Sequence, residues 1–333
     1  MYIEGVNFPK ELIDAIRDDN LVVFAGAGVS KGEPSNLPDF RELANEIAAG
    51  TGKQCDENFP VDRFLGQLKS QNIDTNSMAA KVIRDKCIKH NKLHDGIINL
   101  FSDLNTLKIV TTNYDNLFEK ALKEREQTVQ VFNAPALPLG NDIAGIIHIH
   151  GHMDNPKYMV VTDDDFGVAY LSEGFVSRFL VKLFETYTVL FVGYSYNDVI
   201  VNYLTRGVRR YSTKPKFILT DDHSAAWSDL EITPIYFKNR NFEMLNNAVS
   251  TLGRTMKRRL FDWKNQFSML TDIPPIDPVE IAEIEYNNAV EELQYAMDKL
   301  ERLVSELEAM LAALYDGEVP DAGGDEGGET PAA

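Results

Sequence analysis

One short stretch limits what this chain can fold into. Leu21–Ser30 reads LVVFAGAGVS, in which five apolar residues are followed at once by Gly-Ala-Gly. An apolar run of this length predicts a buried strand of a parallel sheet. Glycine in the next turn permits backbone angles that a side chain would forbid, and it lets a phosphate approach peptide N–H groups. The stretch therefore predicts a strand, a tight turn and a nucleotide phosphate site.

Strands and helices alternate along most of the remaining chain. Apolar runs predict strands at 107–110, 128–132, 145–150, 158–162, 188–192, 216–220 and 233–237. Amphipathic stretches predict helices at 9–20, 40–49, 60–70, 77–90, 93–104, 116–126, 163–185, 197–211 and 242–270. The predicted fold class is α/β, a Rossmann-like, doubly wound and mostly parallel sheet. The strandless part between about 50 and 105 is interpreted as an inserted helical module.

Polar residues gather at the predicted carboxyl ends of five strands. They read GAGVS after the first strand, TTNYD at 111–115, HGH at 150–152, GYS at 193–195 and TDD at 220–222. Ligands of open parallel sheets bind beside the carboxyl ends of the strands. This coincidence predicts a nucleotide site at that edge of the sheet.

Charge and cysteine content exclude several classes of protein. The 333 residues include 33 basic and 51 acidic ones, and a net charge of −18 argues against direct nucleic-acid binding. No apolar run approaches the ~20 residues of a membrane span, and the N-terminus lacks a signal-peptide core. Cys55 and Cys87 are too few for a disulfide framework or a four-cysteine zinc site. We therefore expect a cytoplasmic protein with reduced thiols and no membrane partner.

A longer motif links the glycine turn to a known family. The turn continues into LPDFR at 37–41, so the chain reads GAGVS(x6)LPDFR. This pattern resembles the first nucleotide-binding motif of the sirtuin family. The common dinucleotide fingerprint GxGxxG is absent, because Lys31 stands in place of its third glycine. The resemblance implies an NAD⁺-binding catalytic domain over residues 1–270.

Two segments compete for the asparagine of the sirtuin motif. Residues 71–74 have the family's letters QNID, but they lie between two predicted helices with no strand before them. Thr112-Asn113-Tyr114-Asp115 differs in two letters, yet it directly follows a predicted strand. Because the asparagine has to project from a strand end toward the sugar, we choose Asn113 and interpret Asn72 as a loop residue. The alternative for Asn113 is an ordinary helix N-cap.

Three alternating histidines offer the catalytic base. His148, His150 and His152 would share one face of an extended strand. The base of the family lies in a His-Gly pair, which selects His150 and leaves His152 as the runner-up. No cysteine or carboxylate is placed as an obvious third ligand beside them, so no metal is expected.

The resemblance implies a role for each matching residue. Asn113 positions a water near the anomeric carbon of the ribose, and His150 acts as general base. Asp115 binds the nicotinamide carboxamide. Asp221, after a predicted strand, suits a hydroxyl of the adenosine ribose or lies in a surface turn. The other implied nucleotide-binding residues are Gly26, Ala27, Gly28, Ser30, Asp39, Phe40, Arg41, Gly193 and Ser195.

The lack of zinc-binding cysteines indicates one branch of the sirtuin family. Sirtuin deacylases carry a four-cysteine zinc module, whereas no cysteine lies between His150 and Gly193. The chain therefore looks like the bacterial sirtuin-like NADases of antiphage defence, which implies NAD⁺ as substrate and its cleavage to nicotinamide and ADP-ribose. The alternatives are a zinc-independent protein deacylase and a non-catalytic module that senses NAD⁺ or ADP-ribose.

The C-terminal part predicts assembly. Within 276–314, a long helix carries the a/d pattern of a coiled coil over about four heptads. The seam is Tyr286, Val290, Leu293, Met297, Leu300, Val304, Leu307, Leu311 and Leu314. The acidic, glycine-rich residues 315–333 are expected to be disordered. The seam predicts a homo-oligomer, and the resemblance implies gating by assembly or by a defence partner such as a HerA-like ATPase.

Overall fold

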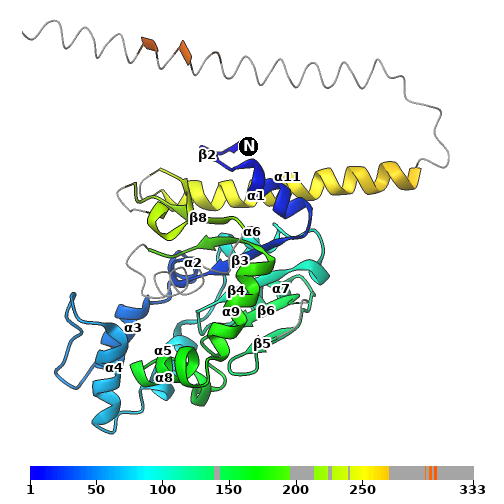
Figure 1. The fold of residues 1–333 in the computed structure, drawn as a ribbon. Helices are drawn as coiled ribbons and strands as arrows, with labels where there is room; N and C mark the ends of the chain where they lie inside the picture. The colour runs from blue at the N-terminus through cyan, green and yellow to red at the C-terminus, as the bar shows by residue number, and fades with distance from the viewer. Residues whose placement is uncertain are drawn as a thin grey trace, which may run out of the picture. The chain divides into compact units, whose positions relative to one another are not determined.

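A seven-stranded parallel sheet forms the centre of the compact unit Met1–Lys264 (Figure 1). A computed structural model describes residues 1–138, 143–195, 214–223, 227–238 and 241–269, with Met297, Leu300, Glu301, Val304 and Ser305. The strands are β3 (Leu21–Ala25), β4 (Lys108–Thr111), β5 (Val131–Asn133), β6 (Gly145–His148), β7 (Thr188–Val192), β8 (Lys216–Thr220) and β9 (Thr233–Tyr236). Their order is β5-β6-β4-β3-β7-β8-β9, and every neighbouring pair is parallel. The predicted α/β fold class is confirmed.

The order of the strands marks one point where the winding of the sheet reverses. The chain passes from β3 to β4 on one side and later returns to β7 on the other side of β3. In doubly wound sheets, ligands bind at such a point, outside the carboxyl ends of the strands. The glycine turn follows β3 directly and therefore lies there.

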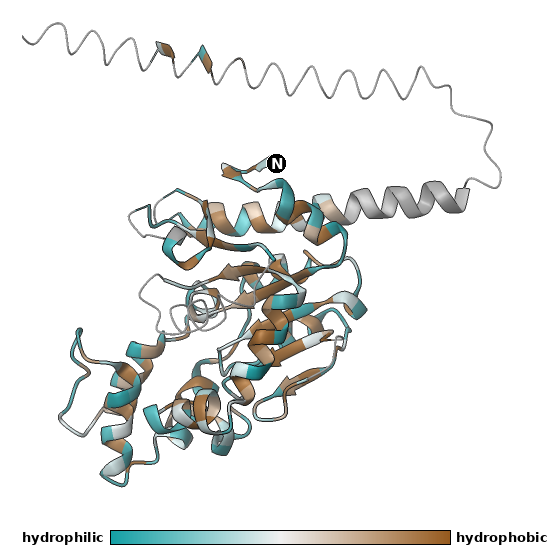
Figure 2. Cartoon of the chain, in the orientation of Figure 1, coloured by the Kyte–Doolittle hydropathy of each residue, from teal (hydrophilic) through white to brown (hydrophobic). Residues whose placement is uncertain are grey.

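All five residues of β3 are buried because helices cover both faces of the sheet. Leu21, Val23 and Ala25 belong to one hydrophobic cluster. Val22 and Phe24 belong to a second cluster, as the alternation of side chains along a strand requires. Figure 2 shows the same division as hydrophobic strands between helices with one hydrophobic side.

Different helices contribute to the two clusters. The first cluster contains residues of α1 (Lys10–Arg17), α6 (Lys92–Ile98), α7 (Leu117–Glu124) and α11 (Phe242–Met269). The second contains residues of α9 (Phe175–Thr186). The chain begins with a short hairpin of β1 (Tyr2–Ile3) and β2 (Val6–Asn7).

A third cluster is built by helices gathered below the sheet in Figure 1. They are α3 (Phe40–Ile47), α4 (Val61–Ser70) and α5 (Thr75–Lys86). These helices fall within or beside the range expected for the inserted module. By contrast, α6 lies in that range but contributes Leu93, Ile97 and Ile98 to the first cluster, against the sheet.

The expected strand at 158–162 is wrong. The segment contains a 3₁₀ helix, η2 (Pro156–Tyr158), then an irregular stretch up to α8 (Asp163–Gly167). The apolar run is explained by burial without a strand partner. The main-chain N–H of Val160 donates to His150, and those of Val161 and Thr162 donate to the Asp165 carboxylate. A π-helix, η3 (Val168–Ser172), connects α8 to α9, and short 3₁₀ helices lie at η1 (Leu104–Thr106) and η4 (Trp227–Leu230).

Several expectations fall on residues outside the described ranges. They are the helix at 197–211, most of the helix at 276–314 and the tail at 315–333. Across the part of the chain that the structure describes, no helix combines the length and apolar character needed to cross a bilayer.

The turns after β3 and β7 pack backbone against backbone. Gly26 N donates to Val192 O at 2.9 Å, and Gly28 N donates to Gly193 O at 3.0 Å. A Cβ atom on Gly28 would lie 2.8 Å from Gly193 Cα. Gly193 itself has φ +77°, and a Cβ atom there would lie 2.5 Å from Val29 N. The close approach of the two turns therefore requires glycine on both sides.

We expect Gly193→Ala to lower the free energy of unfolding more than Gly52→Ala does. Both glycines have positive φ, +77° and +72°, but nothing lies within 4 Å of a Cβ atom at Gly52. Gly52→Ala then costs only the left-handed conformation, about 1–2 kcal/mol. Gly193→Ala also pushes the two turns apart, at about 1–3 kcal/mol more. Urea denaturation measures both, and equal losses would contradict the contact.

Candidate functional site

Asn113 projects from the end of β4 onto the glycine turn. Its Nδ2 donates to Gly26 O at 3.1 Å and to Ser30 Oγ at 3.3 Å. Its main-chain N–H donates to Thr111 Oγ1 at 3.0 Å, which holds the residue at the strand end. Asn72, by contrast, is exposed in the turn between α4 and α5, with φ +65°. Only Asn113 therefore reaches the switch point of the sheet.

Ser30 connects the turn to two further buried side chains. Its hydroxyl donates to Asp115 Oδ2 at 3.0 Å, and His94 Nε2 lies 3.3 Å from Ser30 Oγ. Burial raises the pKa of the Asp115 carboxyl. The other carboxyl oxygen of Asp115 accepts from Leu117 N at 3.0 Å, at the start of α7. The N-cap residue of α7 is Asn116, so Asn113 is not the helix cap, and its amide is directed at the turn.

Two main-chain N–H groups of the glycine turn already donate hydrogen bonds within the protein. The sequence predicts that Gly26, Ala27, Gly28 and Ser30 hold a pyrophosphate. In the structure, the N–H groups of Gly26 and Gly28 donate to Val192 and Gly193. Those two groups hold the turn against β7. α2 (Ala27–Lys31) begins immediately after Gly26 and carries Ser30 toward Asp115.

His150 lies away from the other two histidines of its motif. The strand ends at His148, and Gly151 turns the chain with φ +82°. The expectation that His148, His150 and His152 share one face of a strand is therefore wrong. His150 Nε2 lies 2.8 Å from the Tyr170 hydroxyl, and its ring meets that of Phe166 edge-on at 5.1 Å. Burial lowers the pKa of His150 to about 3, so the ring is neutral.

His148 and His152 meet at a carboxylate instead. Their ring centroids are 4.9 Å apart, and Glu119 Oε1 lies 2.9 Å from His148 Nε2. Burial alone would lower the pKa of His148, but the Glu119 carboxylate raises it above the usual value. His148 Nδ1 lies 3.0 Å from Asn113 O. The cluster of Glu119, His148 and His152 therefore contacts the main chain of Asn113 through His148.

The LPDFR segment has mainly structural contacts. Asp39 caps α3 and forms an ion pair with Lys31 at 2.5 Å. Phe40 faces Phe166 with 6.5 Å between ring centroids. The guanidinium of Arg41 contacts the 55–59 loop, through Cys55 Sγ at 3.1 Å, Phe59 O at 3.3 Å and Asp56 O. Phe40 therefore points to the aromatic surroundings of His150, and Arg41 is engaged elsewhere.

The other expected nucleotide-binding residues follow β7 and β8. Gly193 contacts the turn after β3, as described above. Tyr194, between Gly193 and Ser195, bonds Thr112 Oγ1 at 2.9 Å and Ala25 O at 3.1 Å. It thereby ties the ends of β3, β4 and β7 together. Ser195 is exposed at the end of the described turn, and Asp221 directly follows β8.

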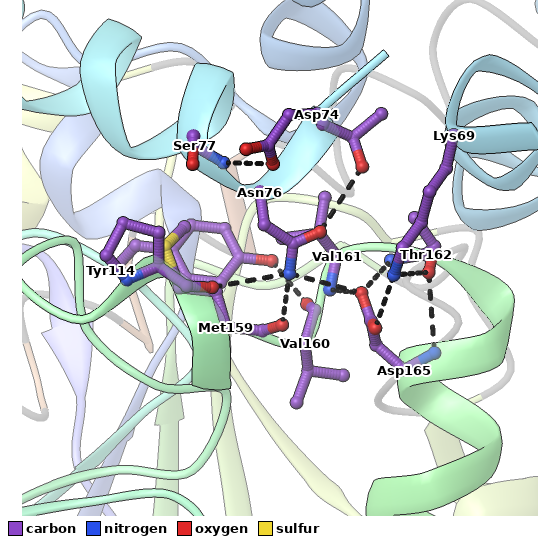
Figure 3. Close-up of polar contacts among 12 residues, drawn as sticks. Lys69, Asp74, Asn76, Ser77, Tyr114, Met159, Val160, Val161, Thr162 and Asp165 are labelled. Carbon is purple, nitrogen blue, oxygen red and sulfur yellow. Dashed lines mark hydrogen bonds and ion pairs between the residues drawn. The ribbon is translucent and has the colours of Figure 1, made fainter. Parts of the chain in front are cut away.

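A polar network holds the segment that follows His150 (Figure 3). Asn76 Nδ2 on α5 donates to Met159 O at 2.8 Å, and the Tyr114 hydroxyl donates to Val160 O at 2.7 Å. Lys69 Nζ on α4 donates to Asp165 Oδ1 at 3.0 Å. The cluster of α3, α4 and α5 is thereby attached to α8, which carries Phe166 against His150.

One family model matches part of the chain. It is the SIR2-like domain, matched over residues 107–245, from the strand before Asn113 to the start of α11. This part of the chain is therefore similar to SIR2-like domains. The glycine turn lies outside the matched range, and contacts with Asn113 and Gly193 connect it to the matched part.

Three curated relatives are similar to much of the chain. Uncharacterized protein y4cA of Sinorhizobium fredii is 29% identical over 269 residues, 70% of this chain and 22% of that protein. Defense-associated sirtuin 2 of Bacillus subtilis is 25% identical over 79% of this chain and 26% of its own length. NAD(+) hydrolase ThsA of Enterococcus faecium is 23% identical over 63% of this chain and 45% of its own length. The chain thus spans less than half of each relative.

Solved structures of Sir2 proteins also match. A Sir2 homologue in complex with NAD is 17% identical, with a TM-score of 0.46, over 77% of this chain and 96% of that one. A Sir2 homologue with ADP-ribose is 16% identical, with a TM-score of 0.43.

Sequence reasoning missed several residues of the candidate site and its surroundings. His94 contacts Ser30 and Tyr170 contacts His150, whereas Glu119 contacts His148 and Tyr194 contacts Thr112. Three of them lie on helices, where a single polar residue resembles an ordinary surface position. Tyr194 had a signal, since it lies within the GYS motif itself.

We expect His94→Gln to reduce the decrease in the free energy of unfolding that occurs as the pH falls. Burial, reinforced by the nearby His90, lowers the pKa of His94 to about 3, although Glu119 acts in the opposite direction. Below the ordinary pKa of about 6.5, the unfolded chain binds a proton that the folded chain does not, so His94 costs up to about 1.4 kcal/mol per pH unit. This loss grows as pH falls from 6.5 toward about 3.

Urea denaturation at pH 7, 6 and 5 measures that slope. Wild type should lose stability more steeply than His94→Gln. The control is His223→Gln, which removes an exposed histidine and should keep the wild-type slope. A His94→Gln slope equal to that of wild type would contradict the prediction.

Proposed function

We propose that this chain hydrolyses NAD⁺ to nicotinamide and ADP-ribose. The observation that carries the proposal is the Asn113 amide, which lies on the Gly26 turn and on Ser30 where the winding of the sheet reverses. A dinucleotide bound at that point would bring its sugar to a strand end that presents an amide, a hydroxyl and a carboxyl group.

The proposed reaction requires that the site stabilise the transition state and position the reactants. The bond between ribose and nicotinamide already has a good leaving group, so the transition state resembles an oxocarbenium ion. Asn113 positions the attacking water, and Asp115 binds the nicotinamide carboxamide. Orienting the reactants can supply several kcal/mol of the barrier reduction. His150, neutral in its buried position, accepts a proton through the sugar hydroxyls, with Tyr170 holding its ring.

The relatives support a biological setting for this activity. Two of them are named as an NAD(+) hydrolase and a defence-associated sirtuin. We infer an abortive-infection effector in the cytoplasm that works as an oligomer and is gated by assembly or by a partner such as a HerA-like ATPase. An ungated NADase would deplete its own host. The greater length of the relatives leaves room for such control elements.

Incubation of the full chain with NAD⁺ tests the proposal. We expect nicotinamide and ADP-ribose in equal amounts, without added metal and without an acylated peptide. Chromatography of the products, with and without an acetylated peptide, gives the result. Turnover only with the peptide would indicate a deacylase, and NAD⁺ binding without turnover would indicate a sensing module.

We expect Asn113→Ala to lower NAD⁺ hydrolysis by about 10²–10³-fold, the typical cost of losing one oriented polar group. The lost hydrogen bonds to Gly26 and Ser30 should cost only about 1 kcal/mol of stability each. The matched control is Asn72→Ala, at an exposed asparagine that should leave the rate unchanged. Steady-state rates at equal folded fractions compare the two, and a larger loss for Asn72→Ala would reverse the assignment.

A further inference from the structure

A second cluster of chemically active side chains contacts the main-chain carbonyl of Asn113. Glu119 on α7, His148 at the end of β6 and His152 beyond Gly151 bring one ligand atom each to within 4.8 Å of one another. We propose that these three residues bind a divalent transition-metal ion of the zinc type. Sequence reasoning found no third ligand beside the histidines. The fold supplies the third ligand, Glu119, from helix α7.

The orientation of His148 suits a metal ligand. Its Nδ1 lies 3.0 Å from Asn113 O, and a carbonyl oxygen can only accept, so Nδ1 carries a proton. The remaining nitrogen, Nε2, faces Glu119 Oε1 at 2.9 Å. Histidines that ligate metals commonly donate their other ring N–H to a main-chain carbonyl, which fixes the ring. His148 has this arrangement without any rearrangement of the main chain.

Glu119 has a buried oxygen that no described group satisfies. Its Oε1 faces His148, whereas its Oε2 has no hydrogen-bond partner among the described residues. Buried polar atoms of this kind are rare, and a carboxylate oxygen left without a partner is costly. A bound cation would satisfy that oxygen and neutralise the carboxylate.

His152 completes the set after a small movement. Its Nε2 lies 4.0 Å from Glu119 Oε1, and its ring centroid is 4.9 Å from that of His148. With metal–ligand bonds of about 2.0–2.1 Å, neighbouring tetrahedral ligands lie about 3.3 Å apart. His148 and Glu119 lie slightly closer than this, at 2.9 Å, whereas His152 has to move nearer to both, because the three ligand atoms are spread over up to 4.8 Å. The main-chain N–H of Asp154 donates to His152 Nδ1 at 3.2 Å, so Nε2 carries the ring proton, and the ring has to turn or change tautomer before it ligates a metal.

The ligand types select the metal. Two imidazoles and one carboxylate suit zinc, cobalt or nickel, whereas calcium and magnesium prefer oxygen ligands alone. Three protein ligands leave a fourth position open. Because His148 contacts Asn113 O, the ion would also fix the main chain that presents the Asn113 amide. The competing occupant is a proton, which would leave His148 and Glu119 as a simple ion pair.

Titration of the full, metal-stripped chain with cobalt(II) tests the site. We expect one equivalent to bind, with the visible absorption of a low-coordinate cobalt site, and zinc to displace it. Glu119→Gln and His152→Gln should each weaken binding by more than the roughly 10- to 100-fold that loss of an outer-shell partner costs. His90→Gln is the matched control, since His90 also lies beside carboxylates, Asp95 and Glu124, and should keep wild-type affinity.

Absence of cobalt binding to wild type, or binding that survives both ligand substitutions, would overturn the proposal. Circular dichroism checks that the variants fold. If a variant does not, X-ray absorption of the zinc-loaded wild-type chain decides, because it counts imidazole ligands directly. Two imidazoles with oxygen support the site, and sulfur or fewer than two imidazoles refutes it. These readouts are independent of NAD⁺ hydrolysis.

Discussion

The close contact between two turns is the constraint on which the rest of the site depends. β3 and β7 are neighbours, and the turns that follow them approach until Gly28 N bonds Gly193 O. A side chain on either glycine would force the turns apart. This contact fixes the end of β3 and the turn after it, to which Tyr194 donates at Ala25 O and Asn113 donates at Gly26 O.

Burial then determines the charge state of the groups around that contact. The Asp115 carboxyl has a raised pKa and accepts from Ser30, and the pKa values of His94 and His150 are lowered to about 3. Each is removed from water by helices that pack against the ends of the strands. His148 differs because Glu119 lies beside it and raises its pKa. Neighbouring histidines thus acquire different chemistry from their surroundings alone.

Two errors of sequence reasoning have one cause. Residues 159–162 are buried and largely apolar, and the HIHGH run alternates, so both resemble strands. In the structure, strand β6 ends at His148, and Gly151 reverses the chain. The later segment is held by Asp165, Asn76 and Tyr114, side chains distant in sequence. Periodicity reports which residues are buried, but not whether a neighbouring strand is present to pair with them.

The sequence by itself determined the α/β class, the parallel strands and the preference for Asn113 over Asn72, because apolar runs and strand-end positions are local properties of the chain. Tertiary structure alone decided which side chains meet across elements. Glu119 reaches His148 from α7, His94 reaches Ser30 from α6, and Tyr170 reaches His150 from η3. Each of these contacts depends on how a helix lies against the ends of the strands, and no local pattern of residues encodes that distance.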